Sequence, residues 1–395
     1  MRTFEHAAPE YSSLQKEDFK LHERDDAIHD AKFETKSVGF FKDAMLRFGK
    51  NTASIIAFII ICIIAFFSIL GPMMNEYGYN DQDLNRANLP ARIPGCEKIN
   101  LLNGSTVLKN RRKDNLTDTE KYPEGCILEI TNESVVNGVK MCDVRIDTYI
   151  YSGYGDDYFW FGTDYLGRDL WTRVWRGCRI SLIIAFAAVL TNVGFGVIYG
   201  SIAGYYGGMV DMVMMRIVDI IYSLPDVLIV ILLSVAIKDM ISNSKNDLII
   251  RLGPGMISIF IVFGLLYWVG MARQVRGQVL SIKEQEYVLA AQASGASAAH
   301  IIRKHMIPNC ISVIIITAAM QIPSAIFTES FLSFVGMGVS MPMPSLGSLA
   351  SDARSGLVSY PYLLLFPAAS IFLIVLSFNL LGNGLRDAFD PKLRS

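Results

Sequence analysis

The chain has 395 residues, of which 52% are hydrophobic and 18% charged, and its mean hydropathy is +0.35. This composition excludes an ordinary water-soluble domain and indicates a membrane protein. The formal net charge of −1 gives no sign of nucleic-acid binding.

The N-terminal part predicts a cytoplasmic tail followed by a membrane anchor. Residues 1–50 mix acidic and basic side chains without a dense apolar pattern, and they show no cleavable signal peptide. Residues 51–74 are apolar over a length that crosses about 30 Å of hydrocarbon as a helix. Lys42, Arg47 and Lys50 precede this span, so the positive-inside rule places the N-terminus in the cytoplasm.

Residues 75–160 are polar and predict a small extracytoplasmic insert. The insert contains Cys96, Cys126 and Cys142. Outside the cytoplasm two of the three could form a disulfide, and the odd count leaves the pairing open. Their spacing matches no metal-ligand motif, so no metal site is predicted.

A turn rich in glycine precedes the second span. Its residues are Gly162, Thr163, Asp164, Gly167, Arg168 and Asp169. The helix that follows has Trp171, Arg173, Trp175 and Arg176 at helical spacing, a mixture typical of the headgroup interface. We therefore expect an amphipathic interfacial helix that leads directly into a second span at 180–203.

The third apolar run, 209–237, contains charged residues. Arg216 and Asp219 are three residues apart, so a neutralising pair near the cytoplasmic end is one interpretation and a polar pathway is the other. Asp226 follows Pro225 at mid-depth and has no partner within a helical turn. Asp226 is therefore the stronger pathway candidate.

Three further spans are expected at 256–272, from about 310, and at 361–381. Glu329 in the fifth span is either a pathway residue or the partner in a helix–helix hydrogen bond. The glycine- and proline-rich stretch 331–347 should line the bundle interior, because irregular backbone at that depth is tolerated only against protein or water. Basic residues gather in the short segments assigned to the cytoplasm, which supports six spans with both termini inside.

Residues 286–308 predict a docking element between two spans. The segment is rich in alanine, serine and glycine, and it should be helical to Ser294, break at Gly295, and resume until Pro308 ends it. Small side chains such as Ala290 and Ala291 allow a helix to lie close to a partner's groove. The alternative is an alanine-rich amphipathic loop without a partner.

The spacing of this element is similar to the cytoplasmic loop of ATP-binding-cassette (ABC) importer permeases. That loop reads Glu-Ala-Ala, three residues, Gly, nine residues, Ile-x-Leu-Pro. Here Leu289-Ala290-Ala291 is followed after three residues by Gly295, and nine residues later by His305-Met306-Ile307-Pro308. Leu289, His305 and Ile307 depart from the pattern, while Glu286 lies nearby as an acidic contact.

Four other stretches, at 162–169, 214–225, 331–338 and 381–394, resemble the C-type permease subunit of bacterial oligopeptide and dipeptide importers. The resemblance implies an all-α polytopic membrane protein with six transmembrane helices in the type I importer permease fold. It implies a second homologous permease, two cytoplasmic ABC ATPases and an extracytoplasmic peptide-binding protein as partners in the bacterial plasma or inner membrane. The core would be 161–382, with a coupling loop at 273–309, an external gate or interface at 162–169, and a cytoplasmic tail at 383–395.

The chain contains no Gly-x-x-x-x-Gly-Lys-Ser/Thr motif, so ATP hydrolysis falls to its partners. We therefore expect no enzyme activity and no cofactor bound by this chain, with ATP and Mg on the ATPases. Peptides are the expected cargo, and nickel chelates, glutathione or opines are alternatives within the class. A self-sufficient channel or secondary carrier is the alternative from another class, and it predicts transport by this chain alone.

Overall fold

The computed structural model describes residues 39–96, 102–136, 138–242, 246, 250, 252–339 and 343–389. The chain divides into two units, 1–43 and 44–395. Of the first unit only residues 39–43 are described, and they include the start of helix α1. The second unit contains the sheet, the helical bundle and every candidate site residue.

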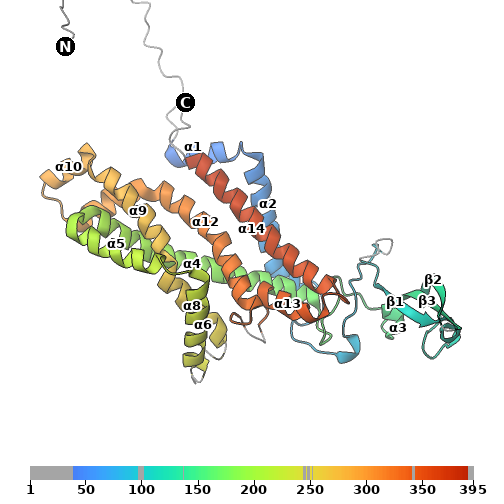
Figure 1. The fold of residues 1–395 in the computed structure, drawn as a ribbon. Helices are drawn as coiled ribbons and strands as arrows, with labels where there is room; N and C mark the ends of the chain where they lie inside the picture. The colour runs from blue at the N-terminus through green and yellow to red at the C-terminus, as the bar shows by residue number, and fades with distance from the viewer. Residues whose placement is uncertain are drawn as a thin grey trace, which may run out of the picture. The chain divides into compact units, whose positions relative to one another are not determined.

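The described residues are mainly helical, with one small sheet (Figure 1). The α-helices are α1 (Phe40–Phe48), α2 (Thr52–Leu70), α3 (Thr148–Tyr151), α4 (Leu170–Tyr206), α5 (Gly208–Tyr222), α6 (Asp226–Ser242), α8 (Pro254–Leu266), α9 (Trp268–Lys283), α10 (Glu286–Ala293), α11 (Ala298–Ile301), α12 (Ile307–Phe334), α13 (Leu346–Asp352) and α14 (Tyr362–Phe389). The strands are β1 (Ser105–Arg112), β2 (Ile127–Val136) and β3 (Val139–Asp147).

Among the described residues, 5 helical stretches are long and apolar enough to cross a membrane, and α5 with α6 makes a sixth if that bent pair is one span. The five are Thr52–Met73, Leu170–Tyr206, Pro254–Lys283, Ala298–Phe334 and Tyr362–Phe389. The helical, multi-span fold class is therefore confirmed. The third apolar run forms two helices instead of one, because α5 and α6 meet at 87°. Pro225 explains the break, since it disfavours helical geometry at the residue before it.

Helix α4 is the centre of the bundle, and α9 packs along it. Three glycines four residues apart make this close approach feasible. A Cβ atom at Gly196 would lie 2.6 Å from the Met271 Cβ, and one at Gly200 would lie 2.4 Å from the Ala272 carbonyl oxygen. A Cβ atom at Gly204 would lie 2.8 Å from the Val279 side chain. Small residues at this spacing let two membrane helices approach through their backbones.

The predicted direct passage from the helix that contains Trp171 into the second span is confirmed, whereas the predicted helix end at Pro308 was wrong. The expected interfacial helix and the second span form one helix of 37 residues, α4. Pro308 does not end a helix, because it lies in the first turn of α12, where its missing N–H is not needed. A π-helical turn, Ile302–Met306, joins α11 to α12, so the membrane helix extends back to Ala298.

The insert contains a three-stranded antiparallel sheet in the order β1-β3-β2. Its small core consists of Cys126, Cys142, Val144 and Ile146. All three cysteines of the insert are free thiols, so the disulfide left open by the sequence is not formed. The Cys126 carbonyl accepts a hydrogen bond from the backbone N–H of Asp147 at the end of β3, and Asp147 is five residues from Cys142 along that strand. At about 3.3 Å per residue that separation is about 16 Å, far beyond the reach of a disulfide.

Candidate functional site

Helix α10 has one face held by the bundle and one face exposed. Val288 is buried with Val279 and Ile282 of α9, in a cluster that also includes Met306. Glu286, Leu289 and Ala290 are exposed, Ala291 is half-buried, and the Leu289 side chain is 50% accessible. The exposed face therefore combines one carboxylate, one leucine and small side chains, which is a surface suited to close contact with a partner.

The break at Gly295 is a Schellman motif. Ala296 N–H donates to the Ala291 carbonyl at 3.1 Å, and Gly295 N–H donates to the Gln292 carbonyl at 2.9 Å. Gly295 has φ +77°, and a Cβ atom there would meet nothing within 4 Å. The glycine is thus required by the backbone conformation and leaves an open surface. Of the other predicted coupling residues, His305 and Ile307 are half-buried and Pro308 is exposed.

The 162–169 turn is a buried joint. Gly162 and Gly167 have φ values of +82° and +73°, and a Cβ atom at Gly167 would lie 1.8 Å from the Asp83 carbonyl oxygen. The Thr163 hydroxyl accepts from Leu89 N–H at 2.8 Å. Among the side chains of this turn, that of Tyr165 is the exposed one. The predicted gate or interface role stays a prediction.

A buried ionic cluster holds this turn against α4 and α13. Asp164 accepts from Arg168 Nε at 2.7 Å and from Arg173 Nη1, and Arg173 also lies 3.6 Å from Asp352. Arg173 is only 2% exposed, so its predicted place at the headgroup interface was wrong. Two buried guanidinium groups need a carboxylate, which explains why Arg173 turns inward.

Asp169 caps the N-terminus of α4. Its Oδ2 accepts from Thr172 N–H at 2.8 Å and from the Asn75 amide at 2.6 Å. Burial raises the pKa of the Asp169 carboxyl, and the hydrogen bonds from Thr172 and Asn75 oppose that rise. The cap fixes where the long helix begins and ties it to the segment that follows α2.

The predicted pair between Arg216 and Asp219 is not formed. Asp219 accepts from Arg273 of α9 at 2.6 Å, and Arg216 is exposed. Arg276 makes a second contact with α5, donating to Asp211 at 2.6 Å. Both acids are on α5, which packs against α9, a contact between distant segments that a sequence-local argument missed. Asp226 is the first residue of α6, and its side chain is outside the described part of the structure.

Glu329 joins two helices inside the bundle. It is fully buried on α12, and its oxygens accept from Ser181 of α4 at 2.7 Å and from Ser333 at 2.8 Å. Ser333 in turn accepts from Val339 N–H at 3.1 Å, which fixes the irregular stretch after α12. This geometry supports the helix–helix hydrogen bond of the two interpretations, since Glu329 lines none of the three cavities described below.

We expect Glu329→Leu to lower the thermal stability of the detergent-solubilised protein more than Glu329→Gln does. Leucine leaves the Ser181 and Ser333 hydroxyls without their buried acceptor, a loss of about 1–3 kcal/mol, whereas glutamine keeps an acceptor oxygen. The midpoint of thermal unfolding measures the difference. Equal stability of both variants, with transport lost in both, would instead favour a pathway role for Glu329.

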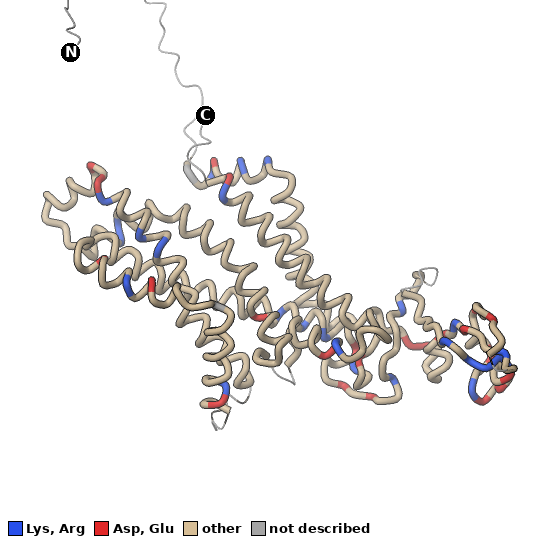
Figure 2. The backbone as a smooth tube through the Cα atoms, in the orientation of Figure 1, with Lys and Arg blue, Asp and Glu red and all other residues tan. Residues whose placement is uncertain are grey.

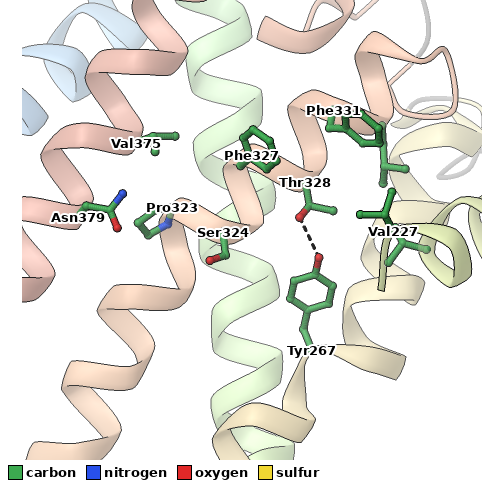
Figure 3. A pocket seen from close by; sticks show the side chains of 11 residues that line it. Val227, Tyr267, Pro323, Ser324, Phe327, Thr328, Phe331, Val375 and Asn379 are labelled. Atoms are coloured by element: carbon green, nitrogen blue, oxygen red, sulfur yellow. Dashed lines mark hydrogen bonds between the residues drawn. The ribbon is translucent and has the colours of Figure 1, made fainter. Parts of the chain in front are cut away.

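Three cavities lie next to one another along α12. The first, about 460 Å³, lies between α6, α12 and α14 near Tyr267, which hydrogen-bonds to Thr328 at 2.8 Å (Figure 3). The second, about 250 Å³, shares Val230, Tyr267 and Ser324 with the first. The third, about 390 Å³, shares Gln321 with the second. We call the three together the α12 track.

The α12 track is mainly apolar and almost uncharged, with a row of neutral polar side chains along it. Its α12 side carries neutral polar residues spaced four, three and four apart, on one face of the helix: Thr317, Gln321, Ser324 and Thr328. Asn379 of α14 adds an amide to the first cavity (Figure 3). Among the described residues that line the track, Arg386 alone carries a formal charge. Charged residues elsewhere gather near helix ends and in the insert (Figure 2).

Sequence reasoning missed the α12 track. Charged residues within the spans were the predicted pathway residues, whereas mainly neutral residues line this surface. The available signal was the helical spacing of the hydroxyl and amide side chains between Thr317 and Thr328. A multi-span helical bundle with connected cavities along one span and an exposed short helix at one end is an architecture found in membrane transport permeases.

The comparisons with known proteins agree with this class. The family model described as binding-protein-dependent transport system inner membrane component matches residues 196–395, and the N-terminal TM domain of oligopeptide transport permease C matches residues 39–91. The chain belongs to this family of inner membrane permease components. Neither model covers 92–195, which contain the sheet and the 162–169 turn.

Several curated relatives are peptide permeases. The oligopeptide transport system permease protein of Bacillus subtilis is 37% identical over 363 residues, covering 92% of this chain and 93% of that protein. The dipeptide transport system permease protein of the same organism is 48% identical over 236 residues, covering 60% and 69%. The resemblance to the C-type subunit is therefore confirmed. A solved amino acid ABC transporter matches 54% of this chain and 93% of its own at 16% identity and a TM-score of 0.39.

Proposed function

We propose that the chain is the transmembrane permease subunit of an ATP-driven peptide importer and forms half of its translocation pathway. The observation that carries the proposal is the 37% identity to an oligopeptide permease over 92% of the chain. The α12 track supports it, because a mainly apolar surface with a row of neutral hydroxyl and amide groups can hold side chains of many kinds and hydrogen-bond peptide backbone. A second, homologous permease would close the other side.

The ATPases would transmit their ATP-driven movement to this chain through α10 and the Gly295 turn. The exposed face of Glu286, Leu289 and Ala290 would lie in a groove of one of two cytoplasmic ABC ATPases. Closure of the ATPase pair would then move α9 and α12 through the buried contact of Val288 with α9. ATP and Mg would be bound by those partners, so this chain would hold no cofactor and catalyse no reaction.

The orientation follows from charge. Arg273, Arg276 and Lys283 lie on α9, and Lys283 is its last residue, next to the segment that leads to α10. Since positive residues favour the cytoplasmic side, we place α10 and both termini in the cytoplasm of a bacterial cell. The insert with its sheet is then extracytoplasmic, on the side where a peptide-binding protein would deliver cargo.

A second cargo is supported by one relative. The glutathione transport system permease protein of Pectobacterium atrosepticum is 39% identical over 236 residues, covering 60% of this chain. Glutathione is itself a small peptide with free carboxylates, so the same neutral track would accept it. Longer coverage by the oligopeptide relative makes general peptides the first proposal.

The test is a pull-down of the detergent-solubilised chain with mass spectrometry and an ATPase assay of the eluate. Wild type should bring a second permease and two ATPases, and Gly295→Arg should lower ATPase recovery at least about tenfold, the loss expected for about 1.4 kcal/mol of binding energy. An arginine at this position places a large cation in the open space beside the turn and strains the positive φ.

Gly138→Arg is the matched control. Gly138 also has a positive φ, +78°, and a Cβ atom there also meets nothing within 4 Å, but it lies in the turn between β2 and β3. This variant should recover as much ATPase as wild type. Purification of the chain without any ATPase, combined with transport by the chain alone, would favour the self-sufficient channel or carrier.

A further inference from the structure

Arg386 of α14 lies at one end of the α12 track. It lines the third cavity together with Gln274 of α9, and with Thr317 and Gln321 of α12. The cavity therefore has three neutral hydrogen-bonding side chains and one cation. It lies on the α10 side of the track, because Thr317 and Gln321 precede Ser324 and Thr328 along a helix that begins next to the coupling segment.

Two polar groups of this cavity make no ion pair or hydrogen bond within the described structure. Among the described residues no carboxylate forms an ion pair with Arg386, whose side chain is exposed. The Oε1 atom of Gln321 is buried and has no hydrogen-bond partner within the described structure. Because Oε1 is an acceptor, it is matched by a donor such as a peptide N–H, while the Arg386 guanidinium is matched by an anionic oxygen.

The side chains of the third cavity favour a ligand with an anionic oxygen. An arginine presents a planar fork of N–H donors that matches a carboxylate with two parallel hydrogen bonds. The Gln321 Oε1 can accept from the backbone N–H of the same terminal residue. No acidic side chain lines the α12 track among the described residues, so an ammonium group finds no counter-charge there.

We propose that Arg386, with Gln274 and Thr317, binds the C-terminal carboxylate of the transported peptide at the α10 end of the track, and that the Gln321 Oε1 accepts from the N–H of the same peptide residue. This inference rests on the proposed function as a peptide permease. The neutral groups from Ser324 to Thr328 then receive the backbone of the same peptide. The rise of α12 from Gln321 to Phe331 is about 15 Å, which an extended segment of about four or five residues spans. Peptides therefore leave the track with the carboxylate end toward the cytoplasm.

The experiment uses the whole importer, purified with this chain and reconstituted into liposomes with its binding protein. The probes are radiolabelled tetra-alanine with a free carboxylate and the same peptide as a C-terminal amide. Arg386→Gln should lower the initial uptake rate of the free acid about tenfold or more, and that of the amide less than about twofold. Arg386→Lys, which keeps the charge without the fork, should fall between wild type and Arg386→Gln for the free acid.

A second measurement avoids dependence on delivery by the binding protein. A tetrapeptide with a photoreactive residue, as free acid and as amide, is cross-linked to the detergent-solubilised importer without nucleotide and without the binding protein. The labelling of this chain by the free acid should drop in Arg386→Gln, while labelling by the amide should not. Lys50→Gln removes an exposed cation outside the track and should change neither measurement.

Three results would overturn the inference. Equal losses for free acid and amide would make Arg386 an assembly residue, and unchanged rates would remove it from recognition. A loss seen only in liposomes containing phosphatidylglycerol, and not in pure phosphatidylcholine, would assign the site to a lipid phosphate instead. Failure of the wild-type importer to transport either peptide is a separate result, since it contradicts the peptide cargo itself.

Discussion

Replacing Gly200 by valine is expected to prevent stable folding of the bundle. A Cβ atom at this position would lie 2.4 Å from the Ala272 carbonyl oxygen and 3.0 Å from Arg276 N, and both are backbone atoms of α9. Backbone cannot rotate away as a side chain can, so α4 and α9 would have to separate. We expect a loss of at least about 3 kcal/mol, the upper end of the overpacking range. The yield of monodisperse protein and the midpoint of thermal unfolding in detergent measure it.

Gly194→Val is the control on the same helix. Gly194 lies six residues earlier on α4, where a Cβ atom meets nothing within 4 Å. The same valine there should leave the midpoint of unfolding close to that of wild type. If both variants were equally unstable, helix propensity rather than contact with α9 would be the cause, and the close packing of α4 on α9 would not be the source of stability.

The glycine spacing shows what the sequence made visible and what it did not. The apolar runs predicted the spans, because hydropathy over about 20 residues reports membrane crossing directly. Gly196, Gly200 and Gly204 were present at four-residue spacing, but only the structure identifies α9 as the helix that they face. Pairing of helices distant in sequence is not encoded in either helix alone.

Some features of the candidate site could be predicted from the sequence, and others could not. Helix α10 and its end at Gly295 were predictable, since a left-handed glycine ends α10 through local hydrogen bonds. The position of Pro308 was mispredicted because proline is compatible with the first turn of a helix as well as with a helix end. The α12 track was missed, because its residues come from α6, α9, α12 and α14 and meet only in the folded bundle.

The partners and burial of charged residues were the features that the sequence predicted least well. Arg216 and Asp219 were expected to pair because they are close in sequence, yet Asp219 binds Arg273, 54 residues away. Arg173 was expected at the headgroups and is instead buried beside Asp164. An ion pair forms where a desolvated charge finds an opposite charge, and that location depends on tertiary structure.

Asp164→Ala is accordingly expected to be the most destabilising loss of a charge in the 162–169 turn. Asp164 accepts from Arg168 N–H at 3.0 Å and from Leu166 N–H at 2.9 Å, in addition to its two arginine side-chain contacts. Its removal takes this carboxylate away from two buried guanidinium groups, while the Asp352 carboxylate remains 3.6 Å from Arg173. Breaking a buried pair from one side costs about 3–5 kcal/mol. Thermal unfolding in detergent should show it.

Two further variants separate charge from hydrogen bonding. Asp164→Asn keeps an oxygen for the N–H groups of Leu166 and Arg168 but removes the charge, so it should lie between Asp164→Ala and wild type. Asp156→Ala removes an exposed carboxylate from the same region and should change the unfolding midpoint little. Since Arg173 connects the turn to Asp352 at the end of α13, uptake should fall with stability in Asp164→Ala. A stable Asp164→Ala protein would show that the two arginines find other partners and that the cluster does not hold α13 in place.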